Sequence, residues 1–329
     1  MSGWLPASSC TPATCTAHAG QARHPASAAA LLLAGCALAL TGALCTPLAL
    51  LLGRATRERL IRCWAHGVVR AFGVRVRVLG PSVPDGGPAA VHGSAGAVLG
   101  TAGAVPGGAG AVLGTAAAVP GSAGAVLGTA GAVPGALGVL VVANHVSWLD
   151  IPLVAAVRPG RMLAKSDIRR WPLLGPLAAL GGTLFVERER LRALPATVGA
   201  VASALRGGSR VVVFPEGSTW CGRGAGGRFR PAAFQAAIDA GAAVQPVRIR
   251  YLAGPPGHRA PAGAASFVGD DPLLASLWRV VTAAGLTAEI RVLPQIPAGS
   301  ALGRRALARL AQSTVASDSA NLPAESVHH

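Results

Sequence analysis

Charge is scarce in this sequence, and one sign dominates it. Only 13% of the 329 residues are charged, yet the net charge is +16, and Lys165 is the only lysine among the basic residues. An excess of arginine indicates an anionic partner, either nucleic acid or a phospholipid surface. Aromatic residues make up 4% and do not interleave with the arginines, so the stacking platforms of a single-strand binder are missing. We therefore predict a phospholipid membrane as partner and no nucleic acid.

Two further motif classes are absent. The six cysteines form no C-x-x-C pair and no Cys/His cluster along the sequence, which predicts reduced structural thiols, no disulfide framework and no metal site. The sequence also has no G-x-S-x-G elbow, which argues against a serine hydrolase. The cysteines are Cys10, Cys15, Cys36, Cys45, Cys63 and Cys221.

One long apolar run lies near the N-terminus. Residues 26–53 carry no charge and are long enough to cross a bilayer core of ~30 Å as a helix. We predict a membrane anchor there. The arginine-rich stretch RATRERLIR follows, and the positive-inside rule then places the downstream chain on the cytoplasmic side of the cell membrane. A secretory signal, with LAGC ending at Cys36 resembling a lipoprotein cleavage box, stays open as an alternative.

A repeat interrupts the chain after the basic stretch. Residues 93–134 are three near-identical copies of 14 residues, rich in Gly, Ala and Val, with too few large side chains to offset their ordering entropy. We interpret them as a duplicated surface loop without function, inserted into a hairpin between strands at Val74–Leu79 and Val139–Ala143. The predicted organisation is an N-terminal tail (1–25), membrane anchor helix (26–53), basic helix and first strand (54–85), repeat insertion (86–138), catalytic domain (139–312) and polar tail (313–329).

From residue 139 onward, short apolar runs alternate with helical patterns. This alternation predicts an α/β fold with a mostly parallel central sheet flanked by helices. The predicted strands are Val139–Ala143, Arg161–Ala164, Thr183–Val186, Arg210–Phe214, Val244–Tyr251 and Glu289–Leu293. The predicted helices are Leu149–Val157, Arg169–Leu180, Ala193–Leu205, Pro231–Ala240, Pro272–Ala283 and Ala301–Ala311.

The stretch VVANHVSWLD places a histidine and an aspartate at the end of an apolar strand. On one continuous helix His145 and Asp150 would point about 140° apart, so they can meet only if His145 lies in the turn before the helix. Open α/β sheets place their sites in such turns. The carboxylate would then fix the imidazole tautomer while the other ring nitrogen takes a proton from a hydroxyl.

Three further blocks follow this one in order. GGTLFVER ends at Arg188, VVVFPEGST ends at Thr219, and VQPVRIRY begins at Val244. With NHVSWLD, they match the four blocks NHxSxxD, GxxFxxR, FPEGTR and V-x-P-V, and the chain resembles the 1-acylglycerol-3-phosphate acyltransferase family over roughly residues 60–310, apart from the repeat. The resemblance implies acyl transfer from an acyl carrier protein (ACP) or coenzyme A (CoA) thioester to the hydroxyl of a lysophospholipid such as 1-acylglycerol 3-phosphate, with no other cofactor.

The resemblance also implies roles for individual residues. His145 would be the general base and Asp150 would orient it, while an acceptor-binding set would hold the head group. That set is Arg188, Glu216, Gly217, Ser218 and Thr219, with Lys165, Arg228 and Arg230 as further candidates. Lys165 can equally be a surface ammonium.

One departure from the family pattern concerns the acceptor. Thr219 stands where the third block has an arginine, which opens a lyso-ornithine lipid as the alternative acceptor unless Arg228 or Arg230 compensates. A non-catalytic, basic lipid-binding membrane scaffold is the remaining alternative.

Overall fold

The computed structural model describes residues 8–18, 20–80, 137–170, 175, 178, 181–187, 189–224, 226–254, 258–301 and 303–317. These residues belong to one compact unit, in which the segment before residue 81 packs together with the segment after residue 135. The repeat at 93–134, Arg188 and most of the helix predicted at 169–180 lie outside the described residues.

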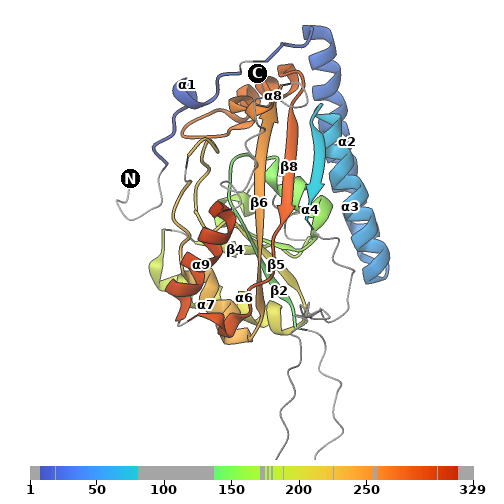
Figure 1. Ribbon diagram of the computed structural model, residues 1–329. Helices are drawn as coiled ribbons and strands as arrows, with labels where there is room; N and C mark the ends of the chain where they lie inside the picture. The colour runs from blue at the N-terminus through green and yellow to red at the C-terminus, as the bar shows by residue number, and fades with distance from the viewer. Residues whose placement is uncertain are drawn as a thin grey trace, which may run out of the picture. The chain divides into compact units, whose positions relative to one another are not determined.

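The core of this unit is a largely parallel sheet (Figure 1). Its strand order is β1-β8-β6-β2-β5-β3-β4, in which β6 and β8 are antiparallel, the other neighbours are parallel, and β7 adds to β6 in antiparallel fashion. The predicted α/β fold is confirmed. The strands are β1 (Arg75–Leu79), β2 (Val139–Ala143), β3 (Arg161–Lys165), β4 (Leu184–Val186), β5 (Arg210–Val213), β6 (Ala243–Ala253), β7 (Ala260–Pro261) and β8 (Thr287–Val292).

The predicted hairpin between the first two strands is wrong. β1 pairs with β8, whereas β2 lies between β5 and β6 in the middle of the sheet. The physical reason is burial: β2 is apolar on both faces and is buried along nearly its whole length, while β1 alternates valine with arginine and is mostly exposed. A strand of the first kind needs neighbours and cover on both sides, and one of the second kind suits an edge.

Helices cover both faces of the sheet. One core packs α2 (Pro25–Leu50), α3 (Arg54–Ala71), α4 (Asp150–Val157) and α8 (Leu273–Thr282) against the sheet, and the other packs α6 (Leu194–Arg206), α7 (Ala232–Ala240) and α9 (Gly303–Ser317). Val141 and Ala143 of β2 face the first core, and Leu140 and Val142 face the second, as the two-residue period of a strand requires. The short α1 (Pro12–Cys15) precedes them, and 3₁₀ turns lie at Ser166–Arg170, Leu191–Ala193, Gly263–Ala265 and Ala298–Ser300.

The last described helix ends later than predicted. We predicted a helix at Ala301–Ala311, but α9 continues to Ser317. Val315 is buried in the second core, so the last turn of this helix belongs to the folded body.

Helix α2 coincides with the predicted anchor. Within the described residues it is the one helix that is long and apolar enough to cross a membrane, with a mean hydropathy of 2.2 in its most apolar window. Its start is held to the body, because the Arg23 guanidinium donates to the carbonyls of Val281 and Ala283. The chain just after its end is held too, because Arg54 donates to the carbonyl of Gly208. With α3 beside it, α2 therefore lies along the body rather than leading away from it (Figure 1).

Candidate active site

The two strongest motifs meet at one edge of the sheet. β2 ends at Ala143 and is followed by His145, and its parallel neighbour β5 ends at Val213 and is followed by Glu216. Because the carboxyl ends of parallel strands lie at the same edge, the two loops lie side by side. The backbone N–H of His145 donates to Glu216 Oε2 at 2.7 Å, which joins the loops directly.

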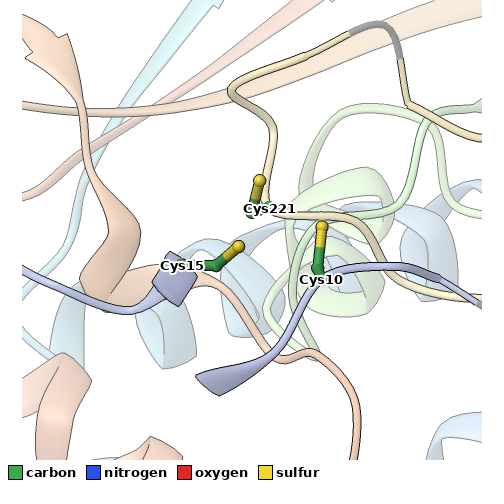
Figure 2. A group of neighbouring side chains, drawn as sticks. All are labelled: Cys10, Cys15 and Cys221. Atoms are coloured by element: carbon green, nitrogen blue, oxygen red, sulfur yellow. The ribbon is translucent and has the colours of Figure 1, made fainter. Parts of the chain in front are cut away.

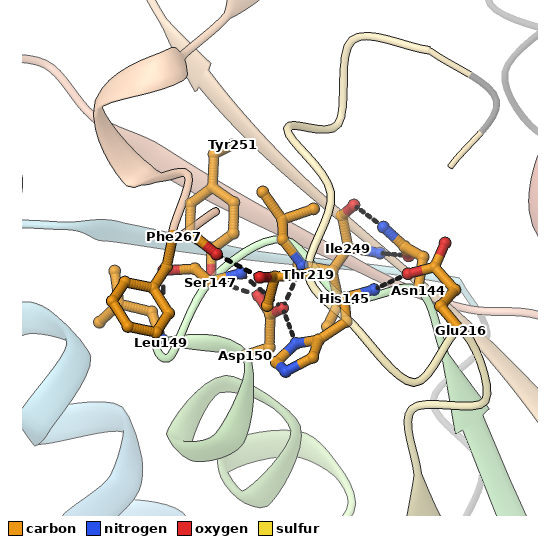
Figure 3. Close-up of polar contacts among 11 residues, drawn as sticks. Asn144, His145, Ser147, Leu149, Asp150, Glu216, Thr219, Ile249, Tyr251 and Phe267 are labelled. Carbon is orange, nitrogen blue, oxygen red and sulfur yellow. Dashed lines mark hydrogen bonds and ion pairs between the residues drawn. The ribbon is translucent and has the colours of Figure 1, made fainter. Parts of the chain in front are cut away.

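Asp150 is the centre of the hydrogen-bond network (Figure 3). Its Oδ2 lies 2.8 Å from His145 Nδ1 and also accepts the backbone N–H groups of Val146 and Ser147, at 2.6 and 2.9 Å. Its Oδ1 accepts the hydroxyl of Tyr251 at 2.7 Å. The carboxylate is fully buried, so these partners replace the water it has lost. The predicted contact between His145 and Asp150 is confirmed: the histidine lies in the turn and folds back onto the helix start.

The imidazole of His145 is fixed in plane as well as in tautomer. It stacks on Phe214, with ring centroids 4.1 Å apart and an angle of 15° between the planes. Its side chain is 20% exposed. Nδ1 is engaged by Asp150, and none of the described residues forms a hydrogen bond to Nε2. Nε2 is therefore the ring nitrogen that can accept a proton from a substrate.

Tyr251 is a site residue that the sequence motifs did not single out. Burial raises the pKa of its phenol well above the ordinary value, and the nearby charge of Asp150 raises it further, so the hydroxyl stays protonated and donates. The available signal was modest: Tyr251 is the only tyrosine of the chain and ends the VQPVRIRY block. Because β6 is longer than β2, Tyr251 reaches past the end of β2 to Asp150.

Asn144 completes the attachment of the first loop. Its side-chain amide donates to the carbonyl of Ile249 at 2.9 Å and accepts the N–H of the same residue at 2.8 Å. This side chain therefore continues the pairing of β2 with β6 after β2 has ended. The asparagine of the first block has a structural role here.

Glu216 holds the two loops together. Besides accepting from His145, its carboxylate accepts the N–H of Gly227 through Oε1 at 3.0 Å, and it is 4% exposed. Burial raises its pKa to about 7, outweighing the two backbone donors, which lower it; the charge of Asp150 raises it further. Gly226 has φ of +70°, and a Cβ there would lie 2.5 Å from Glu216 Oε1, so the loop needs glycine at that position.

The rest of the third block and the tryptophan that follows it provide two kinds of side chain. Thr219, at the family's arginine position, donates its hydroxyl to the carbonyl of Phe267 and is thereby used inside the protein. In contrast, Ser218 Oγ and Trp220 Nε1 are buried and have no hydrogen-bond partner among the described residues. Gly217 turns the chain between these two groups and the strand, with φ of 75°.

Within the described part of the chain, the remaining basic candidates form no ion pair with Asp150 or Glu216, although the N–H of Arg230 donates to the carbonyl of Pro215 at 2.8 Å. Lys165 ends β3 and pairs with Asp167, and both side chains are substantially exposed, which favours the surface-ammonium interpretation. Arg228 and Arg230 are exposed on either side of the buried Phe229. The structure gives no position for Arg188.

A different group of arginines lies next to the site. A cavity of about 420 Å³ is bordered by Arg223, Arg248 and Arg250, and it shares Val146 and Tyr251 with the His145–Asp150 network. The alternation of arginine and apolar residues in VQPVRIRY was the available sequence signal, since it places the arginines of β6 on the opposite face from Ile249. Guanidinium groups bind phosphate or carboxylate oxygens in paired hydrogen bonds.

The chain is similar in sequence to several known proteins. Residues 130–250 match the acyltransferase family. A lyso-ornithine lipid O-acyltransferase of Brucella abortus is 33% identical over 189 residues, which cover 54% of this chain and 69% of that protein. This chain belongs to the acyltransferase family.

The names of two other relatives give different acceptors. A lyso-ornithine lipid O-acyltransferase of Pseudomonas aeruginosa is 41% identical over 182 residues, covering 54% of this chain and 66% of that protein. A 1-acyl-sn-glycerol-3-phosphate acyltransferase of Neisseria gonorrhoeae is 41% identical over 152 residues, covering 46% and 58%. The chain thus spans about three fifths to two thirds of the length of these two relatives.

A solved structure shares the fold. The 1-acyl-sn-glycerophosphate acyltransferase of Thermotoga maritima superimposes with a TM-score of 0.54 at 17% identity, over 89% of this chain and 95% of that one. In the present chain, Ser147, inside the first block, is fully buried and accepts the N–H of Leu149 at 3.3 Å. Its hydroxyl therefore caps the turn, in agreement with the absence of a serine-hydrolase motif.

Proposed function

We propose that this acyltransferase moves a fatty acyl group from an acyl-ACP or acyl-CoA thioester to the free hydroxyl of 1-acylglycerol 3-phosphate, which gives phosphatidic acid. The observation that carries the proposal is the His145–Asp150 pair: Nδ1 is fixed by a buried carboxylate at 2.8 Å, and Nε2 remains for a hydroxyl proton. The membership of the chain in the acyltransferase family supports the same chemistry.

The reaction needs no covalent enzyme intermediate. Nε2 of His145 takes the acceptor's hydroxyl proton as the oxygen attacks the thioester carbonyl, and the imidazolium that forms is stabilised by Asp150. The carbon–sulfur bond then breaks and the thiol leaves with the proton. The N–H groups of His145, Val146 and Ser147 are already bonded to Glu216 and Asp150, so the negative oxygen of the tetrahedral intermediate takes its donors from elsewhere.

The cavity beside the site supports a phosphate-bearing acceptor. Three arginines border it, and among the described residues none that line it is an aspartate or a glutamate. A phosphate monoester carries close to two negative charges and suits such a lining, whereas an ornithine head group pairs one carboxylate with one ammonium and has no net charge for the three arginines to neutralise. The lyso-ornithine lipid stays the second candidate, because Thr219 replaces the family's arginine and one relative at 41% identity is named for that acceptor.

Membrane attachment through the α2–α3 pair completes the proposal. α2 exposes large apolar side chains, among them Leu33 at 71%, Leu44 at 79% and Leu48 at 67%. Such a surface is typical of a segment that enters the lipid, and the arginines of α3 would contact anionic head groups. Since both ends of α2 are held by the body, we propose that it lies in one leaflet, with the catalytic body on the cytoplasmic side where acyl thioesters are made.

The proposal can be tested by acyl-thioester turnover in detergent micelles. Purified full-length chain is offered lysophosphatidic acid, lyso-ornithine lipid or glycerol 3-phosphate with one acyl thioester, and released thiol is measured. We expect lysophosphatidic acid to give the highest kcat/KM, and we expect Arg250→Ala and Arg188→Ala to raise KM for it more than for a neutral lysolipid. Arg206→Ala, at the end of α6, is the matched charge control.

Each alternative has its own outcome in this assay. A clear preference for lyso-ornithine lipid, or equal effects of the arginine variants on charged and neutral acceptors, would replace the phosphate acceptor with the second candidate. Lysolipid-independent thiol release, or none at all from a folded protein, would contradict acyl transfer and favour the lipid-binding scaffold.

A further inference from the structure

Three of the six cysteines come together outside the catalytic network. The sulfur atoms of Cys10, Cys15 and Cys221 all lie within 4.8 Å of one another (Figure 2). Two come from the N-terminal segment around α1, and the third comes from the loop that follows the third block. The sequence analysis predicted reduced structural thiols and no metal site, and spacing along the chain gave no sign that these three cysteines would meet.

The dimensions of the cluster match those of a metal–thiolate site. Zinc–sulfur bonds are about 2.3 Å, so three sulfurs around one ion lie about 4 Å apart, and a small adjustment of the side chains would reach that spacing. All three thiols are free and partly buried. Within the described part of the chain, no histidine or carboxylate joins the group. A purely sulfur donor set disfavours Mg²⁺ and Ca²⁺, which prefer oxygen ligands.

We propose that Cys10, Cys15 and Cys221 bind a thiophilic d¹⁰ cation, Zn²⁺ or Cu⁺, which fastens the N-terminal segment to the loop after β5. Soft thiolates select these two ions, and binding displaces the thiol protons. Cu⁺ is satisfied by three thiolates. Zn²⁺ takes a fourth ligand from solution at the open position.

The segments are already held in place around this cluster. Arg223 donates to the carbonyl of Ala17 at 3.2 Å, and Ser266 donates to the carbonyl of Cys221 at 3.2 Å. The three ligands are therefore partly preorganised, which lowers the ordering cost of binding.

The position of the cluster gives the bound ion a structural consequence. Trp220, next to Cys221, donates its backbone N–H to the carbonyl of His145 at 2.8 Å, and Arg223 borders the cavity beside the site. An ion at the cluster would thus stiffen the loop that connects the general base to the arginine-lined cavity.

Metal analysis of the full chain tests the proposal independently of catalysis. Protein purified under reducing, anaerobic conditions is analysed for bound metal, then stripped and titrated in separate arms with Zn²⁺ and Cu⁺ against a competing chelator. We expect one ion per chain in the wild type and in Cys45→Ser/Cys63→Ser, whose exposed thiols lie outside the cluster. Cys221→Ala and Cys10→Ser/Cys15→Ser should bind the preferred ion at least tenfold more weakly. The arm that shows this difference identifies the ion.

The same experiment can overturn the proposal. Equal binding by the wild type and both cluster variants, or no binding of either ion, contradicts it. Thiol counting on native protein prepared without reductant adds a check, because a disulfide within the trio would assign the cluster to a cross-link instead. If Cys221→Ala does not fold, the Cys10→Ser/Cys15→Ser variant decides, since it changes only the N-terminal segment.

Discussion

The two sides of His145 differ in how their polar atoms are satisfied. On the side of Asp150, the carboxylate oxygens accept four hydrogen bonds from His145, Val146, Ser147 and Tyr251. On the side of the third block, the buried Ser218 Oγ and Trp220 Nε1 have no partner among the described residues.

We call the side of Asp150 the holding side, because its hydrogen bonds fix His145. We call the side of Ser218 and Trp220 the receiving side, because its donors are left for a ligand. A buried polar atom without a partner costs about 1–3 kcal/mol, so a folded protein keeps one mainly where something else compensates. The satisfied side fixes the base in one orientation before substrate arrives. On the unsatisfied side, which ends one residue before the cavity-lining Cys221, we propose that the two buried donors serve the acceptor or the thioester.

The sharpest test of the holding side is removal of the base. We expect His145→Ala to lower kcat about 10²–10⁴-fold, the usual contribution of general base catalysis, with little change in thermal stability. Single-turnover thiol release measures the effect, and His258→Ala, an exposed histidine, is the matched control. Activity within a few-fold of wild type would remove His145 from the catalytic role.

Asp150→Asn should cause the next largest loss. The amide offers one acceptor oxygen in place of two, and its NH₂ group would face donors, so both activity and folding should suffer, with kcat down on the order of 10²-fold. Tyr251→Phe removes one of the four donors and should cost about tenfold. Measuring kcat and melting temperature for both variants checks the ranking; the reverse order would show that Tyr251 itself acts on substrate.

Glu216 predicts a pH dependence of stability. Its pKa in the folded protein is raised to about 7 from the ordinary 4.5, so the folded state binds the proton more tightly than the unfolded state. The resulting contribution is fully present below pH 4.5 and is lost as pH rises through 7, on the order of 3 kcal/mol. Urea unfolding at intervals from pH 4.5 to 8, compared with Glu216→Gln, measures it. Identical slopes for both proteins would contradict the raised pKa.

Ser218→Ala tests the receiving side directly. If the hydroxyl serves a ligand, its removal should lower kcat/KM about tenfold while leaving stability unchanged or slightly higher, because an unpaired buried group disappears. Thr219→Val is the matched control, since that hydroxyl bonds to the carbonyl of Phe267 and its loss should destabilise the fold. A destabilised Ser218→Ala protein with unchanged kinetics would break the comparison between the two sides.

The smallest effect is expected far from both sides. Deleting residues 93–134 in frame should leave activity and membrane association nearly unchanged, because shortening a long connection changes its closure entropy little. β1 runs antiparallel to β2 three strand positions away, about 14 Å, and residues 80–92 and 135–138 can bridge that distance. Sedimentation with vesicles and thiol release measure the outcome; loss of folding would show that the repeat packs on the body.

Much of the catalytic half could be predicted from local pattern. The alternation of apolar runs with helical segments predicted the strands of the sheet to within a few residues, because burial on both faces demands continuous apolar strands. The five-residue spacing of His145 and Asp150 predicted a turn before a helix, because a continuous helix could not bring them together. The order of the four blocks indicated the acyltransferase family.

The tertiary structure alone decided what depends on partners distant in sequence. Five features of this kind join residues that are separated by long stretches of chain. They are the neighbours of β1, the attachment of α2 along the body, the support of Asp150 by Tyr251, the arginines of the cavity and the three-cysteine cluster. Sequence periodicity reports which face of an element is buried, but not which element covers it. Which element covers a buried face is determined by packing and hydrogen bonds across the whole fold, and these contacts join residues that are far apart in the sequence.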